Sequence, residues 1–208
     1  MAQRSTKPVK EPRVWQRMLS GRRLDLIDPS PFDIEIEDIA HGLARVARWN
    51  GQTSGSHAFS VAQHSVIVEH LCGHLSPDLA GEKRLMALLH DAPEYVIGDM
   101  ISPFKAILGD SYKGVEKRLE EAIHMRFGLP GRMPAPLKKL IKRADNICAW
   151  FEAVQLAGFS EAEATGFFGA PPEDIRLQLE PLPAEQAHAQ FMDRHVTLLA
   201  SLETGAPA

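Results

Sequence analysis

Apolar side chains recur at helical spacing along most of this chain, and residues 134–157 show the pattern most fully. Leu137, Ile141, Ala144, Cys148 and Phe151 fall on one face of a helix in that segment. We expect further helices, separated by prolines and glycines, at about 38–48, 58–75, 80–91, 112–127 and 184–202. The sequence therefore predicts an all-α protein built as a bundle of helices.

Residues 1–32 differ from the rest and are predicted to be a basic N-terminal arm followed by a turn-rich segment. Seven of residues 1–23 are basic and one is acidic. Such an arm could touch a polyphosphate or a nucleic acid, but we expect a solvated tail. The alternation of Leu24 and Leu26, then of Ile34 and Ile36, permits a small hairpin. One helical domain is expected over 33–205, in which residues 165–172 form a loop.

Composition excludes several classes of protein. The net charge of −4 argues against a dedicated nucleic-acid binder, which would usually be basic. Cys72 and Cys148 lie on apolar helical faces, so we expect two buried thiols, no disulfide and a reducing compartment. No apolar run is long enough to span a membrane, and the N-terminus lacks the apolar core of a signal peptide. A cytoplasmic protein without a membrane partner is predicted.

An imidazole and a carboxylate stand side by side at the end of an apolar run. His90 and Asp91 follow Leu88 and Leu89, so one helix end would deliver both a nitrogen and an oxygen ligand. The pair alone is a weak signal, because His-Asp also arises by chance on a surface or in a core. Two further residues change its interpretation.

His64 and Asp145 are the other two residues that fit a shared metal site. His64 lies among apolar residues at helical spacing, so its ring should point inward. Asp145 sits on the edge of the apolar face of its helix, where a carboxylate needs a partner or a metal. Lys142 or Arg143 could be that partner. Three helices that each direct a side chain of a metal-binding type inward nevertheless favour one shared metal site.

The arrangement resembles the HD-domain metal-dependent phosphohydrolase superfamily, whose pattern is His, then His-Asp, then a distant Asp. Residues 90–105, HDAPEYVIGDMISPFK, are similar to the motif of the bacterial 5'-deoxynucleotidase-like branch. Residues 47–49 resemble its Arg-Trp pair, and residues 144–149 resemble its distal Asp segment. The resemblance covers roughly residues 38–160. Two departures are Ile101, where the branch usually has Pro, and an N-terminal extension of about thirty residues.

This resemblance implies an all-α HD-domain helical bundle with one divalent metal ion. Its four ligands would be His64, His90, Asp91 and Asp145. The ion would lower the pKa of its water and polarise a phosphoryl group. Nitrogen and oxygen ligands without thiolate suit Mn, Co, Fe, Ni, Zn or Mg. Related enzymes suggest a homodimer.

Six more residues are candidates for the chemistry and for substrate binding. The paired acids Glu94 and Asp99 would serve the attacking water and the leaving oxygen, in an order that the sequence leaves open. Outside the motif, Glu94 would be a solvated acid at a helix end and Asp99 an N-cap. The substrate-binding candidates are Arg48 for the phosphate, Trp49 for the sugar, Lys105 as a mobile positive charge, and His57, which is expected to begin the helix that carries His64.

The predicted function is a metal-dependent phosphoric ester hydrolase, a 5'-deoxynucleotidase that releases phosphate from deoxyribonucleoside monophosphates. Three alternatives stay open. The first is hydrolysis of a deoxynucleoside triphosphate or another nucleotide, and the second is a non-hydrolytic nucleotide sensor. The third is a di-iron carboxylate protein, since Glu121 with His124 and Glu185 with His188 have the Glu-x-x-His spacing of such bundles.

Overall fold

The computed structural model describes residues 13–204, apart from the side chains of residues 102, 103, 106, 110, 111, 203 and 204. The all-α prediction is confirmed, and no helix in this range is long and apolar enough to cross a membrane. The helices are α1 (Ile36–Leu43), α2 (Val61–Leu75), α3 (Gly81–Leu88), α4 (Glu94–Ile97), α5 (Ser102–Leu108), α6 (Asp110–Arg126), α7 (Ala135–Gln155), α8 (Glu161–Phe168) and α9 (Ala184–Thr204). The six helices expected from periodicity correspond to α1, α2, α3, α6, α7 and α9.

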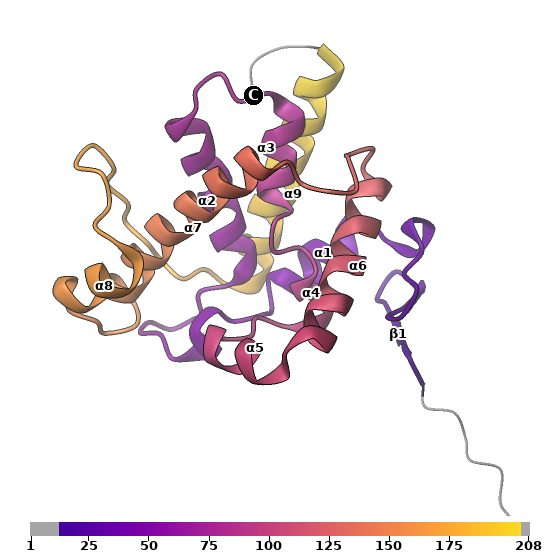
Figure 1. Ribbon diagram of the computed structural model, residues 1–208, viewed down its shortest axis with the longest axis horizontal. Helices are drawn as coiled ribbons and strands as arrows, with labels where there is room; N and C mark the ends of the chain where they lie inside the picture. The colour runs from indigo at the N-terminus through magenta and orange to yellow at the C-terminus, as the bar shows by residue number, and fades with distance from the viewer. Residues whose placement is uncertain (1–12, 205–208) are drawn as a thin grey trace, which may run out of the picture.

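Helix α2 lies in the interior of the bundle (Figure 1), where it packs against α3, α7 and α9. Ser60 begins the helix by accepting a hydrogen bond from the Gln63 N–H. The five consecutive residues 61–65 are all buried, because neighbouring helices cover α2 on several sides. A polar side chain on this part of α2, such as His64, is therefore held inside the protein.

The other helices enclose α2. Helix α9 contacts α1, α2 and α3, and α7 runs from α2 to α8 (Figure 1). Leu43, Leu88, Leu119, Ile123 and Phe191 are fully buried in the hydrophobic core that joins these elements. Burial of large aliphatic and aromatic side chains stabilises such a core by roughly 1.5–3 kcal/mol each. The thiols of Cys72 and Cys148 are buried and unpaired, as predicted.

A two-stranded hairpin precedes the helices. Strand β1 (Trp15–Arg17) pairs antiparallel with β2 (Arg23–Asp25), in the register Gln16 to Leu24. The predicted hairpin is thus present, but its second pairing segment is not 34–36. Proline and serine residues at 29–31 favour a turn before it, and η1 (Pro31–Asp33), a 3₁₀ helix, leads into α1. Residues 1–12 of the expected basic arm lie outside the described residues.

The hairpin is attached to the helical body by polar and apolar contacts. Asp38 on α1 accepts hydrogen bonds from the backbone N–H and the hydroxyl of Ser20. Arg22 forms an ion pair with Glu35 at 2.6 Å. Leu24 is fully buried in the common core. Residues 20–38 therefore link the hairpin to the bundle.

The loop predicted for residues 165–172 is wrong in its first half, because residues 165–168 continue α8. Ser160 and Glu163 form a capping box, in which each side chain bonds the backbone N–H of the other. This cap starts a helix that the glycine at 166 had obscured. Gly169, with φ of 80°, ends it in the left-handed region that glycine adopts readily. Helix α8 packs against the end of α7 (Figure 1).

Candidate active site

The four residues predicted as metal ligands lie together where α2, α7 and the turn between α3 and α4 meet. His64 Nε2 is 3.4 Å from Asp145 Oδ1 and 3.6 Å from Asp91 Oδ2. His90 Nε2 is 3.3 Å from the same Asp91 oxygen, and the two imidazole centroids are 5.4 Å apart. Nitrogen and carboxylate atoms thus converge from three distant parts of the sequence.

Both imidazoles are held through Nδ1 and leave Nε2 without a hydrogen bond. His64 Nδ1 lies 2.6 Å from Glu152 Oε1, and His90 Nδ1 lies 2.9 Å from the carbonyl oxygen of Ala87. That carbonyl can only accept, so His90 carries its hydrogen on Nδ1 and the neutral ring keeps a free lone pair on Nε2. Both Nε2 atoms are buried and lack a hydrogen-bond partner among the described residues.

These unpartnered atoms fit a divalent metal ion. Leaving a buried polar atom unpaired costs free energy, and a metal-binding histidine is typically fixed by a hydrogen bond at its other ring nitrogen. His64, His90 and Asp145 each offer a ligand atom within 4.8 Å of the others. Asp91 could supply a fourth ligand atom, because its Oδ2 lies 3.6 Å from His64 Nε2 and 3.3 Å from His90 Nε2. A set of imidazoles and carboxylates suits Mn, Co, Fe, Ni, Zn or Mg.

The two aspartates are ionised, as ligands must be. Burial acts to raise the pKa of Asp91, but the neighbouring imidazole of His90 outweighs it and holds the pKa well below its usual range. Burial also acts to raise the pKa of Asp145, but the His64 imidazole, 3.4 Å from Oδ1, outweighs this effect and lowers the pKa. Asp145 also meets the partner suggested by the sequence, since its Oδ2 lies 2.8 Å from Lys142 Nζ. Its two oxygens therefore face different partners.

Glu94 is a buried carboxyl beside this cluster. It begins α4, is only 3% exposed, and its Oε1 lies 3.4 Å from Lys105 Nζ. Its Oε2 is buried without a hydrogen-bond partner among the described residues. Burial, reinforced by the charges of Asp91 and Asp99, raises the pKa of Glu94 to about 9. The reading of Glu94 as a solvated helix-end acid is therefore wrong.

Asp99 lies between α4 and α5 and does not cap a helix. The N-cap of α5 is Ile101, whereas the Asp99 carboxylate pairs with Arg48 Nη1 at 3.2 Å. Burial raises the pKa of Asp99, and the Arg48 charge opposes this shift. The two acids thus differ in environment, because Glu94 faces a lysine amine and Asp99 faces a guanidinium.

Glu152 on α7 connects the predicted Arg-Trp pair to the four predicted metal ligands, which we call the ligand cluster. Its Oε2 accepts hydrogen bonds from Trp49 Nε1 at 2.7 Å and from Arg48 Nε at 3.2 Å, while its Oε1 faces His64. Glu152 is fully buried. Burial acts to raise its pKa, but the charges of Arg48 and His64 prevail and lower the pKa to about 2. Glu152 is therefore an ionised carboxylate shared by three functional candidates.

The backbone at Trp49 adopts an unfavourable conformation. Trp49 and Asn50, in the 3₁₀ segment η2 (Arg48–Gly51), have φ angles of 56° and 50°. This left-handed conformation is rare for a bulky residue and costs on the order of 1–3 kcal/mol. The hydrogen bond to Glu152 and ring contacts with Phe159 and Phe168 hold the indole in place.

The last two substrate-binding candidates are placed differently. Lys105 on α5 reaches Glu94 and also Glu116, at 3.3 Å. His57 is exposed and lies in the loop before α2, so the expectation that it begins this helix is wrong; the helix starts after the Ser60 cap. His57 does not line either of the two cavities beside the ligand cluster.

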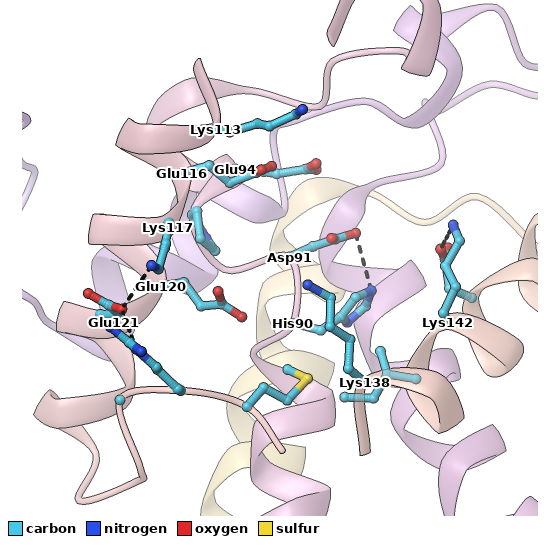
Figure 2. Close-up of a pocket in the computed structure, with 16 residues that line it drawn as sticks. His90, Asp91, Glu94, Lys113, Glu116, Lys117, Glu120, Glu121, Lys138 and Lys142 are labelled. Atoms are coloured by element: carbon cyan, nitrogen blue, oxygen red, sulfur yellow. Dashed lines mark hydrogen bonds and ion pairs between the residues drawn. The ribbon is translucent and has the colours of Figure 1, made fainter. Parts of the chain in front are cut away.

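Two cavities meet at the cluster and share Asp91, Glu94, Lys142 and Asp145. The first, of about 550 Å³, is also lined by Arg48, Trp49, Asp99, Lys105 and three phenylalanines. The second, of about 560 Å³, lies between α6 and α7. Figure 2 shows its charged lining, which includes Lys113, Lys117 and Lys138 beside Glu116, Glu120 and Glu121.

Sequence reasoning missed Glu152 and the phenylalanines of the first cavity. The signal for Glu152 was its spacing, because it lies two helical turns after Asp145 and one turn after Cys148 on the same face of α7. Phe159, Phe167 and Phe168 had no comparable signal. Phe167 and Phe168 reach the cavity through the packing of α8 on α7, and Phe159 lies in the segment between these two helices.

The two Glu-x-x-His pairs do not form a di-iron site. Within residues 13–204, the groups of atoms that could hold a metal contain His64 with His90 and Asp145, or His64 with Cys148 and Glu152. Glu121 instead pairs with Arg132 at 3.4 Å. The structure therefore gives the di-iron alternative no support.

The contacts of Glu152 lead to a testable prediction. Glu152→Gln keeps the size of the side chain but removes the charge that His64 and Arg48 face. We expect the affinity for a divalent ion to fall about 10–100-fold, the usual effect of losing a group that orients a metal ligand. Titration of the metal-stripped protein with Mn²⁺ or Co²⁺ measures the change.

A matched control separates metal binding from stability. Glu69 on α2 is also a fully buried carboxylate, but it pairs with Arg84 and Arg194 away from the cluster. Glu69→Gln should lower the melting temperature without altering metal affinity. Equal metal affinity in wild type and Glu152→Gln would contradict the positioning role.

The chain is similar to known proteins over most of its length. A family model described as 5'-deoxynucleotidase YfbR-like matches residues 39–197. An uncharacterized protein of Rhodobacter capsulatus is 58% identical over 192 residues, which are 91% of this chain and 98% of that protein. The uncharacterized protein YfdR of Escherichia coli is 35% identical over 178 residues, which are 86% and 92% of the two chains.

Proposed function

We infer the activity from one premise, which is that the chain belongs to the YfbR-like 5'-deoxynucleotidase family of HD-superfamily hydrolases. We propose that it is a metal-dependent phosphohydrolase that releases phosphate from deoxyribonucleoside 5'-monophosphates. One observation supports the proposal most strongly. Two buried, unpartnered imidazole nitrogens face two ionised aspartates beside a cavity that Arg48, Glu94 and Asp99 also line.

His64, His90, Asp91 and Asp145 would hold the divalent ion. When bound, such an ion polarises a phosphoryl oxygen and makes a nearby water more acidic. Glu152 fixes the His64 ring through Nδ1, and the Ala87 carbonyl fixes the His90 ring in the same way. Both rings therefore present Nε2 without having to reorient.

Arg48 and Lys105 bring positive charge to the first cavity and would attract the phosphate. The Arg48 guanidinium is nearly buried and is already aligned by Asp99 and Glu152. A planar, pre-aligned guanidinium loses little entropy when it binds a phosphate oxygen. Lys105 approaches from α5, on the side of Glu94.

The two acids would divide proton transfer between them. Burial and the charges of Asp91 and Asp99 raise the pKa of Glu94 and so favour its protonated form, and its carboxyl would donate to the 5' oxygen of the departing nucleoside. Asp99 is held by Arg48 and would accept a hydrogen bond from the attacking water. We therefore propose Glu94 as the general acid and Asp99 as the group that orients the water.

Trp49 would exclude the 2'-hydroxyl of a ribonucleotide by shape. Trp49→Ala should narrow the deoxy-to-ribo ratio of kcat/KM by about tenfold, since a pocket wall rejects one added hydroxyl by no more than about a hundredfold. Arg48→Ala should depress both constants together, because both substrates carry the same phosphate. Matched deoxy and ribo monophosphates of one base measure the ratio.

A third variant separates shape from hydrogen bonding. Trp49→Phe keeps a flat ring but loses the N–H that Glu152 accepts. It should retain most of the sugar preference. An unchanged ratio in a folded Trp49→Ala protein would show that Trp49 only fills space.

A nucleotide panel tests the reaction itself. The metal-loaded protein is incubated with mono-, di- and triphosphates, and phosphate, pyrophosphate and triphosphate are assayed separately. Phosphate from deoxynucleoside monophosphates supports the proposal. Triphosphate release would support the triphosphohydrolase alternative, and binding without any product would support the sensor.

A further inference from the structure

Four aromatic side chains form a continuous surface in the first cavity, which we name the aromatic wall: Trp49, Phe159, Phe167 and Phe168. The Trp49 ring lies 5.6 Å from that of Phe159 and 6.0 Å from that of Phe168, between centroids. Phe167 lies 6.1 Å from Phe159 and 6.2 Å from Phe168. All four residues line the cavity that Asp91 and Asp145 also line.

The aromatic wall starts beside the ligand cluster and extends away from it. The indole N–H of Trp49 bonds Glu152, which in turn faces His64. Phe159 and Phe168 contact the indole ring, and Phe167 contacts both of them. A ligand with its phosphate at the cluster would therefore have its other end against the phenylalanines.

Fixed elements carry the wall. The capping box of Ser160 and Glu163 sets the start of α8, and Trp150 on α7 donates a hydrogen bond to Thr165 on α8 at 3.0 Å. Helix α8 therefore presents Phe167 and Phe168 from a defined position beside α7 (Figure 1). A surface that is ordered before binding loses little entropy on binding.

The chemistry of the wall selects a flat partner. Its phenylalanines offer no hydrogen-bonding group, and the N–H of Trp49 is already donated. Among the described residues lining this cavity, Asn146 supplies the uncharged amide. Phe167 is 72% exposed, so much of its ring is available to a ligand. Planar heterocycles stack on such rings through their faces.

We propose that the phenylalanines of the aromatic wall bind the purine or pyrimidine base of the nucleotide by stacking, with Phe167 as the outer contact. This inference rests on the proposed nucleotidase function and adds to it the site for the base. The cavity volume of about 550 Å³ falls within the 300–1,000 Å³ that is typical of small-molecule sites. The phosphate would lie at the cluster, and the sugar at Trp49.

The test compares substrates with and without a base. Stacking on one aromatic side chain is worth at least about fivefold in affinity. In Phe167→Ala, kcat/KM for deoxyadenosine 5'-monophosphate should fall about fivefold or more relative to that for 2-deoxyribose 5-phosphate, which has no base. Phe167→Trp should restore the ratio. The control Phe32→Ala removes an 80% exposed ring on η1 outside the cavity and should leave the ratio unchanged.

A binding measurement separates failure of this inference from failure of the proposed function. Deoxyadenosine carries no phosphate, so calorimetry reports its binding whether or not the protein hydrolyses anything. Weaker binding in Phe167→Ala than in Phe32→Ala supports the wall, even if no substrate is turned over. Equal binding in the two variants, or equal loss with the base-containing and the base-free substrate, would overturn it while leaving the nucleotidase proposal intact.

Discussion

Asp145→Ala is expected to bind a divalent ion at least about a hundredfold more weakly than the wild type and to lose activity with it. The substitution removes the carboxylate that faces His64 Nε2 from α7, while the other three predicted ligands stay in place. Because even groups that merely orient a ligand are worth 10–100-fold in affinity, the loss of a ligand should reach at least the upper end of that range. Metal content after gel filtration, with circular dichroism on the same sample, measures both ion and fold.

Asp193 provides the matched control for this experiment. It is an exposed aspartate on α9, away from both cavities, so Asp193→Ala should keep its ion and its activity. A folded Asp145→Ala protein with wild-type metal content would rule out the assignment of Asp145 as a ligand.

Glu94→Gln is expected to retain the ion but to lose on the order of a hundredfold or more in turnover of deoxynucleotides, the scale of general acid catalysis. The amide keeps the shape of the buried carboxyl but has no acidic proton to give. Steady-state kinetics together with metal content on the same preparation test both parts of the statement. Full activity in both Glu94→Gln and Asp99→Asn would contradict the assignment of these two acids to catalysis.

A substrate with a good leaving group distinguishes the two acids. Nitrophenolate departs without needing a proton, so Glu94→Gln should lose much less activity on p-nitrophenyl phosphate than on a deoxynucleotide. Asp99→Asn, which affects the attacking water, should lose activity on both. The opposite pattern would exchange the two roles.

Glu94→Gln also tests whether the Glu94 carboxyl carries a proton in the folded protein. In the metal-stripped protein, the folded pKa of about 9 exceeds the ordinary value of 4.5, so the folded state holds a proton that the unfolded chain releases. This stabilisation is complete below pH 4.5 and is lost as the pH rises towards 9. Glu94→Gln should therefore be less sensitive to pH over that range in thermal unfolding.

The sequence predicts the parts of this molecule that depend on local pattern. Apolar periodicity located α1, α2, α3, α6, α7 and α9, and it placed His64 on an inward face. Short-range spacing identified His90 and Asp91. What the sequence could not give were contacts between distant segments. Glu152 meets Trp49 across 103 residues, and no local pattern records that approach.

The remaining differences between the sequence-based predictions and the structure arise where capping or tertiary contacts outweigh a local sequence signal. A glycine at 166 suggested a loop, whereas the Ser160 cap and packing on α7 produced α8. Asn50 and Gly51 mark a turn in the sequence, but nothing there shows that Trp49 shares its left-handed conformation, in which its contacts hold it. The homodimer, the cytoplasmic location and the domain boundary at residue 33 stay predictions.

The carboxylate of Glu152 has a thermodynamic consequence. One of its oxygens faces His64 and the other accepts a hydrogen bond from Trp49, so a shift of this side chain changes both contacts at once. Under the proposed function, ion binding and sugar discrimination would then be linked equilibria. Suppose that the bound ion increases the preference for binding deoxynucleotide over ribonucleotide by some factor. By thermodynamic reciprocity, the protein's affinity for the ion must then be higher by the same factor with deoxynucleotide bound than with ribonucleotide bound.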